Sequence, residues 1–180
     1  MLSALLSFSL THLTVLALVL PWFSIRHDTT IGSCKLYNGD AYSMFSRICG
    51  IELRNLDYNG WNAKFTSIRI FLWISVVVSV LVYVLQTLTD YAASVTLYKW
   101  NMLLYLVILL SSLLTLIEYI TEMDDNFPTD VYHPYESGYI FCIMTCVVSF
   151  ILAVLSLLNH TYNCRQCAVG DLMGVKDDEY

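Results

Sequence analysis

The stretch that decides the fold is residues 22–67, WFSIRHDTTIGSCKLYNGDAYSMFSRICGIELRNLDYNGWNAKFTS. It is a long polar segment with a pair of cysteines, Cys34 and Cys49, and apolar stretches flank it on both sides. Apolar residues make up 57% of the 180 positions and charged residues 13%, about half the ~25% of soluble domains. A soluble fold of this size cannot hide that much apolar surface, whereas a bilayer can. The sequence therefore predicts a membrane protein that displays one polar loop.

Four apolar stretches are each about as long as the ~20 residues that a helix needs to cross the hydrocarbon core. The expected spans are residues 2–22, 68–88, 100–120 and 138–158. Loop one then covers residues 23–67, and short loops cover 89–99 and 121–137. We expect residues 1–162 to form one domain, an all-α four-helix transmembrane bundle, and residues 163–180 to form a flexible cytosolic tail. The first stretch lacks the basic start and cleavage site of a signal peptide, so we expect it to be retained.

Loop one alternates polar and apolar residues at its start and near Cys49, a pattern typical of short strands. The dipeptide Asn38-Gly39 predicts a turn. We expect a small extracellular antiparallel β-sheet of two to four strands on the outer ends of the helices, with a Cys34–Cys49 disulfide across it. Such a bridge stabilises the folded state by ~3 kcal/mol in the chain-entropy model, and it needs an oxidising compartment. The alternative is two free thiols.

Tryptophans near the ends of three spans, Trp22, Trp61 and Trp100, are expected to anchor the helices at the membrane interface, where indole rings are enriched. Beyond the fourth span, Cys164 and Cys167 form a juxtamembrane pair typical of S-palmitoylation. The same pair offers only two of the four ligands of a structural zinc site. We therefore expect lipidation there, and no metal or other cofactor.

Small residues repeat at helical spacing inside the spans. Ser75 and Ser79 share one helix face, and Thr145, Ser149 and Ala153 share another. Small residues at this spacing let helix backbones approach closely. We expect such faces to contact neighbouring helices, including those of other membrane proteins.

Ionisable residues are rare inside the spans. His12 in the first span is a candidate proton relay or ligand, and the alternative is a neutral imidazole bonded to a neighbouring helix. Glu118, near the end of the third span, is a candidate coupling carboxylate or a hydrated side chain. Residues 121–137 carry acidic side chains without Lys or Arg, and we expect a solvated acidic rim there. The net charge of −6 and the lack of a basic cluster argue against nucleic-acid binding.

Two rules give opposite orientations in the membrane. With both termini in the cytosol, the outer side carries more lysine and arginine than the inner side, against the usual bias. The outer residues are Arg26, Lys35, Arg47, Arg54, Lys64 and Arg69, and the inner ones are Lys99, Arg165 and Lys176. The cysteines favour cytosolic termini, because a disulfide needs an oxidising side and palmitoylation the cytosol. We expect cytosolic termini and a location in the plasma membrane, with endomembranes as the alternative.

The layout of the chain combines several features. The first span ends in Pro21-Trp22, a longish loop with a cysteine pair follows, the other two loops are short, and a cysteine pair follows the last span. This layout resembles the claudin and peripheral-myelin-protein superfamily, although residues 31–33 here are Ile-Gly-Ser where that family has Gly-Leu-Trp before its first cysteine. The resemblance implies a left-handed four-helix bundle with an outer β-sheet. It also implies roles in cell contact, paracellular sealing or regulation of channels and receptors.

The sequence thus favours a non-enzymatic membrane protein. We expect it to act in cell contact or membrane organisation, or as an auxiliary subunit of a membrane complex, with loop one as the contact surface and the bilayer and other membrane proteins as its partners. One alternative is a thiol–quinone oxidoreductase resembling vitamin K epoxide reductase, with Cys142 and Cys146 facing the quinone and Cys34 and Cys49 as the shuttle. The weakness is the spacing, since such sites use Cys-x-x-Cys. The other alternative is an oligomeric pore.

Overall fold

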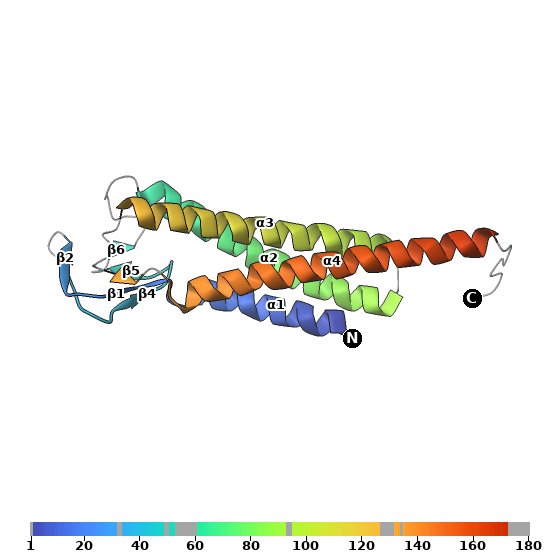
Figure 1. Cartoon of the computed structure of the whole chain (residues 1–180). Helices are drawn as coiled ribbons and strands as arrows, with labels where there is room; N and C mark the ends of the chain where they lie inside the picture. The colour runs from blue at the N-terminus through green and yellow to red at the C-terminus, as the bar shows by residue number, and fades with distance from the viewer. Residues whose placement is uncertain are drawn as a thin grey trace.

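The computed structural model describes residues 2–31, 34–48, 51–52, 61–92, 95–126, 132–133 and 135–172. Four helices dominate it, and each runs antiparallel to the next in an elongated bundle (Figure 1). They are α1 (Leu2–Val19), α2 (Trp61–Ala92), α3 (Val95–Asn126) and α4 (Ser137–Leu172). Each helix packs against two others, so that the order around the bundle is α1, α2, α3, α4. Both described ends of the chain lie at the end of the bundle opposite the short strands, and α4 extends well beyond the start of α1 (Figure 1).

Three helices are long and apolar enough to cross a membrane: α2 over Phe65–Tyr91, α3 over Thr96–Thr121 and α4 over Ser137–Tyr162. The apolar part of α1, Ser3–Val19, is shorter. All four helices expose large apolar side chains on their outward surfaces. Because water would disfavour that surface and lipid would not, these helices indicate a membrane protein.

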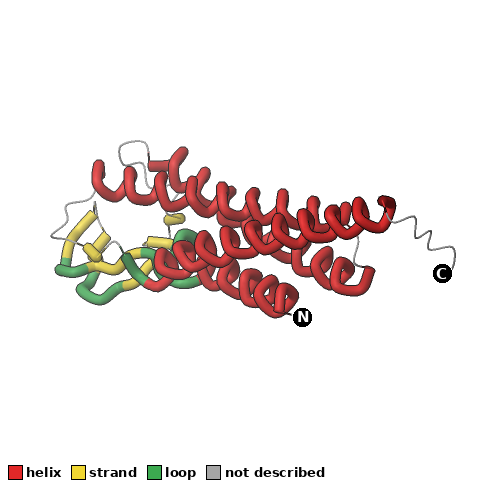
Figure 2. The backbone as a smooth tube through the Cα atoms, turned by 45° about the vertical axis from the view of Figure 1, so that its right-hand side comes forward, coloured by secondary structure: helices red, strands yellow, loops and turns green. Residues whose placement is uncertain are grey.

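Three helices, α2, α3 and α4, extend beyond the predicted spans, whereas α1 ends at Val19, before the end of the predicted span at residue 22. The predicted loop at residues 89–99 is wrong in large part, because α2 continues to Ala92 and α3 begins at Val95. The fourth helix continues to Leu172, so the first ten residues of the predicted tail are helical (Figure 2). The physical reason is that hydropathy marks where contact with lipid can end, whereas a helix continues for as long as its backbone hydrogen bonds do.

Small hydroxyl side chains line the contacts between helices. Ser75 Oγ lies 2.7 Å from Ser111 Oγ on α3, and Thr14 Oγ1 lies 3.0 Å from Ser79 Oγ on α2. These side chains are buried. The faces expected from the small-residue spacing therefore pack helices of this same chain against one another, and are not free for another protein.

A second polar layer lies at the end of the bundle near the termini, and it joins α1, α2 and α3. The Gln86 carbonyl oxygen accepts hydrogen bonds from Asn101 Nδ2 at 3.2 Å and from the Tyr105 hydroxyl at 3.4 Å. Asn101 also donates to Thr89 Oγ1 at 3.0 Å, and Tyr105 bonds to Ser7 on α1. Since all five side chains are buried, this layer fixes the relative positions of the three helices.

The described parts of the polar loops form three small antiparallel sheets. A three-stranded sheet has the order β4 (Ala41–Tyr42), β1 (Phe23–Ile25), β7 (Tyr132–His133). Two two-stranded sheets accompany it. They pair β2 (Thr29–Ile31) with β3 (Cys34–Leu36), and β5 (Arg47–Ile48) with β6 (Ile51–Glu52).

The antiparallel pairing is confirmed, but the prediction of one sheet within loop one is wrong, because β7 comes from the third loop and pairs with β1. The alternation in β1 is confirmed, since Phe23 and Ile25 are buried and Ser24 between them is partly exposed. The turn at Asn38-Gly39 is confirmed as well. Asp40 N donates to Tyr37 O at 3.1 Å, and Gly39 has a φ of 90°, which favours glycine.

Replacing Gln86 by leucine removes the shared acceptor of the second polar layer. Asn101 and Tyr105 then lose a buried partner, so we expect the free energy of unfolding to fall by about 1–2 kcal/mol. Denaturant titration of the purified chain in mixed micelles measures this change. Thr87→Val on the same helix is the control, because Thr87 is exposed and bonds only to Tyr83 O of its own helix. Equal losses for the two variants would contradict the role assigned to Gln86.

Candidate functional site

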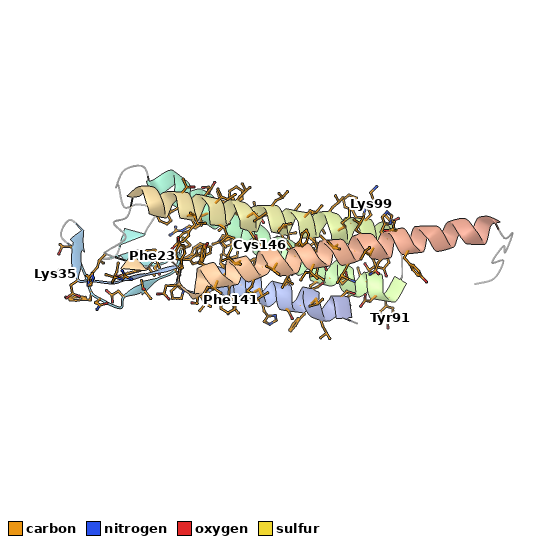
Figure 3. The ribbon with its side chains drawn as sticks, in the orientation of Figure 1. Phe23, Lys35, Tyr91, Lys99, Phe141 and Cys146 are labelled. Atoms are coloured by element: carbon orange, nitrogen blue, oxygen red, sulfur yellow. The ribbon has the colours of Figure 1, made fainter. Side chains whose placement is uncertain are left out.

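The candidate site is the structure that the loops form at the end of the bundle opposite the termini. We call it the loop platform, and it comprises the described residues of 21–52 together with 132–133 and 135–136. Its outer tip carries Lys35, while Phe23 lies where the platform meets the helices (Figure 3). Because two loops that are distant in the sequence build it, its shape depends on how both are attached to the bundle.

Trp22 makes the main attachment. Its side chain is 0% exposed, and its indole Nε1 donates to Ala17 O at 2.7 Å. That carbonyl lies in the last turn of α1, where no further residue of the helix can bond to it. The indole therefore caps the end of α1. The predicted role of Trp22 as an interface anchor is wrong in this respect: its ring contacts the protein core, in edge-to-face contact with Tyr119 at 5.0 Å, and has no surface to offer to headgroups.

The backbone of Trp22 connects three further elements. Its N–H donates to Tyr42 O at 2.8 Å, and its carbonyl accepts from the Tyr119 hydroxyl at 2.9 Å and from Glu136 N at 3.1 Å. Loop one, α3 and the segment before α4 thus meet at one residue. Gly138 completes the junction, because a Cβ atom there would lie 2.5 Å from the indole. Only glycine allows α4 to begin this close to Trp22.

Arg69 makes the second attachment, from the first turns of α2. Its Nε donates to Met44 O at 2.5 Å, and its guanidinium lies 5.0 Å from the centre of the Phe45 ring. Met44 itself is fully buried. Through these contacts the arginine holds the turn between β4 and β5 against the helices.

Asp40 organises the turn beside the three-stranded sheet. Its Oδ2 accepts from Tyr37 N at 3.0 Å and from the Tyr42 hydroxyl at 3.3 Å. Burial first, and then the negative charge and hydrogen bond of Asp40, raise the pKa of the Tyr42 phenol. Tyr42 thus remains a neutral donor throughout the physiological range, and the turn keeps its shape.

The outward surface of the platform mixes aromatic rings with charges of both signs. Tyr37 is 59% exposed and Tyr135 53%, and the ring of Phe45 is also partly exposed. Among the platform side chains that the structure describes, the exposed charged ones are Arg26, Asp28, Lys35 and Arg47. Exposed aromatic rings on a firmly attached base are typical of protein-binding surfaces.

The predicted cysteine sites fall partly outside the described residues. Cys34 is the first residue of β3, but its side chain and the whole of Cys49 lie outside them, so the disulfide stays a prediction. Cys164 and Cys167 lie on the last turns of α4, where the backbone is described and the side chains are not. Lipidation of this pair likewise stays a prediction.

The other two predicted anchors differ from Trp22. Trp100 lies in α3 and is 56% exposed, so its ring is available to lipid. Trp61 begins α2, with its side chain outside the described residues. Their roles at a membrane interface remain predictions.

The residues named for catalysis or transport lie in ordinary packing environments. Cys142 and Cys146 are free, buried thiols on the same face of α4 (Cys146 is labelled in Figure 3), and Cys142 Sγ lies 3.7 Å from Ser112 O. Glu118 accepts a hydrogen bond from Ser67 Oγ at 2.5 Å, across α3 and α2. The expected bond from His12 to a neighbouring helix is wrong, because His12 is exposed and its Nδ1 bonds to Phe8 O of α1 itself.

Sequence reasoning missed three residues of the junction. Tyr119, Glu136 and Gly138 act through contacts with Trp22 that join segments about 100 positions apart. The one sequence signal was Glu136-Ser-Gly138 directly before an apolar stretch. This pattern indicates where a helix begins, but not which residue packs against that start. Comparison with models of known protein families gave no match, and comparison with curated proteins gave none either.

Replacing Trp22 by phenylalanine removes the indole donor and leaves the Ala17 carbonyl buried without it. We expect the free energy of unfolding to fall by about 1–3 kcal/mol. The matched control is Trp100→Phe, which alters an exposed ring and should change stability by less than about 0.5 kcal/mol. Thermal unfolding of both variants in the same detergent measures the difference, and a larger loss for Trp100→Phe would refute the role of Trp22 as the main attachment.

Replacing Arg69 by glutamine removes the cation over Phe45 and the bond to Met44 O. We expect amide hydrogen exchange in residues 43–46 to accelerate about tenfold, while exchange in the helices stays unchanged. Lys99→Gln at the opposite end of the bundle is the control (Figure 3). Unchanged exchange in residues 43–46 would mean that Arg69 does not hold this turn.

Proposed function

We propose that this chain is a non-enzymatic, four-span membrane protein whose loop platform is an extracellular docking surface for other membrane proteins. It acts in cell contact and membrane organisation or as an auxiliary subunit of a membrane complex. The observation that carries the proposal is the combination of a firmly attached platform base with exposed aromatic rings, Tyr37 and Tyr135. A rigid surface loses little conformational entropy on binding, and tyrosine is among the residues that contribute most at interfaces.

The orientation supports the same proposal. If α1 crosses the membrane in addition to the three long helices, the chain has four antiparallel spans. Both termini then lie on one side of the membrane and the loop platform on the other (Figure 1). A Cys34–Cys49 disulfide would then form on the outer side, and Cys164 and Cys167 would be open to cytosolic acylation. The plasma membrane is the location in which such a platform can meet a second cell.

Arg69 bears on the conflict between the lysine and arginine count and the cysteines. Its guanidinium is engaged by Met44 and Phe45 inside the folded platform. The positive-inside bias is counted over loops shorter than ~60 residues, and only longer segments translocate with little regard to their charge. Loop one lies within that length, so its proposed outer position rests on the cysteines rather than on the basic residues.

The orientation is tested with two single-residue variants, Lys35→Cys on the platform and Lys99→Cys at the opposite end (Figure 3). Intact cells that express each variant are treated with a membrane-impermeant maleimide, and labelling above that of the unsubstituted chain is measured. We expect labelling at position 35 alone. Labelling at position 99 alone would place the platform in the cytosol and overturn the proposal.

The docking role is tested with Tyr37→Ser and Lys35→Glu in non-adhesive cells. We expect both variants to reach the surface and to lower cell–cell aggregation, or recovery of a cross-linked membrane partner, by about tenfold. Tyr91→Ser and Lys99→Glu are the matched controls, since Tyr91 is 94% exposed at the opposite end. If the platform variants behave like the unsubstituted chain in both assays, the platform is not the contact surface.

A further inference from the structure

Two buried polar side chains beside the second polar layer lack a hydrogen-bond partner. Asn101 of α3 is 0% exposed, and no described residue donates to its carbonyl oxygen, Oδ1. Ser156 of α4 is 5% exposed, and no hydrogen bond joins its hydroxyl to another described residue. Every other buried serine or threonine of the described helices has a bonded partner. Because an unpaired polar group in the core is costly, these two side chains require a further group.

The orientation of the Asn101 amide follows from an exposed charge. Asp90 Oδ1 accepts from Gln86 Nε2 at 3.0 Å, and an ionised carboxylate can only accept. The Gln86 carbonyl oxygen therefore faces Asn101, whose Nδ2 donates to it and to Thr89 Oγ1. A reversed Asn101 amide would set two carbonyl oxygens against each other. Both Nδ2 protons are thus used on α2, and the partner that Asn101 Oδ1 requires is a donor.

The register of α3 and α4 brings Ser156 to the level of Asn101. The two helices are antiparallel neighbours, and Cys142 Sγ of α4 lies 3.7 Å from Ser112 O of α3. From this contact toward the termini, Asn101 is 11 residues away and Ser156 is 14. At ~1.5 Å per residue the two positions differ by only about 5 Å along the bundle. Side chains lean toward the N-terminus of their own helix, so in this antiparallel pair Asn101 and Ser156 lean toward each other.

The group between these side chains must be small and uncharged. Ala153 and Ser156 leave space on the buried face of α4, because both have small side chains. The buried polar residues of the described helices include no Asp, Glu, Lys or Arg, so the core offers no counter-charge to a metal ion. Water both donates and accepts, and buried water normally bonds to polar groups that are otherwise unpaired.

We propose that a water molecule is bound in the core of the bundle, between Asn101 of α3 and Ser156 of α4. It donates a proton to Asn101 Oδ1 and accepts the proton of the Ser156 hydroxyl. The second polar layer, which otherwise joins α1, α2 and α3, then includes α4 as well. This inference goes beyond the proposed function, and it holds whether or not the loop platform binds a partner.

The test uses the full-length chain in detergent micelles, with ¹⁵N in its asparagine side chains. Magnetisation transfer between water and the Asn101 Nδ2 protons is measured, and this signal is assigned by its loss in Asn101→Leu. The sign of the rotating-frame cross-peak separates bound water from proton exchange. We expect a cross-peak from bound water that disappears in Ser156→Val, because the added methyl groups fill the space. Thr161→Val, an isosteric change at an exposed position of α4, is the control and should keep the cross-peak.

Denaturant titration provides the second measurement. We expect Asn101→Leu and Ser156→Ala to be coupled, so that the unfolding equilibrium constant of the double variant is about 3- to 10-fold smaller than the two separate effects predict. No cross-peak in the unsubstituted chain would overturn the proposal, and coupling without a cross-peak would mean a direct bond instead. A cross-peak that persists in folded Ser156→Val would exclude Ser156 as a ligand. Should Ser156→Val not fold, additive effects of Asn101→Leu and Ser156→Ala would contradict the bridge.

Discussion

The structure depends on the burial of Trp22. Its indole caps the last turn of α1, its N–H pairs with Tyr42 in loop one, and its carbonyl accepts from Tyr119 of α3 and from Glu136 before α4. Hydrogen bonds of this kind are electrostatically stronger away from water, and an unpaired buried group is correspondingly costly. One residue thus fixes where α1 ends, where the three-stranded sheet begins and where α4 starts.

The two ends of the bundle are held by different chemistry. Around Trp22 the contacts are aromatic rings and backbone hydrogen bonds, which attach the platform. At the opposite end, Gln86, Asn101 and Tyr105 form a side-chain network between helices. Between them the core is filled by apolar side chains and small hydroxyls. A bundle held at both ends and filled between them favours a scaffold over a single-chain pore, because a conducting path would have to open through packed side chains.

Much of the fold could be predicted from the sequence, because hydropathy acts locally. The three long apolar helices, the alternation at Phe23–Ile25 and the turn at Gly39 all follow from short-range patterns. The misplaced elements depend on long-range contacts instead. The residues near Trp22 in the sequence do not indicate that Gly138 leaves room for the indole ring. Residues 132–133 likewise do not indicate that they pair with β1. A tryptophan after an apolar stretch can lie at a membrane interface or in a protein core. Which of the two it occupies depends on the residues that pack against it in the fold.

The candidate contact surface depends on long-range contacts in the same way. The exposure of Tyr37 and Tyr135 depends on how the platform folds onto the bundle. It therefore cannot be predicted from the composition of the loops alone. The outward position of His12 likewise depends on which face of α1 packs against α2 and α4.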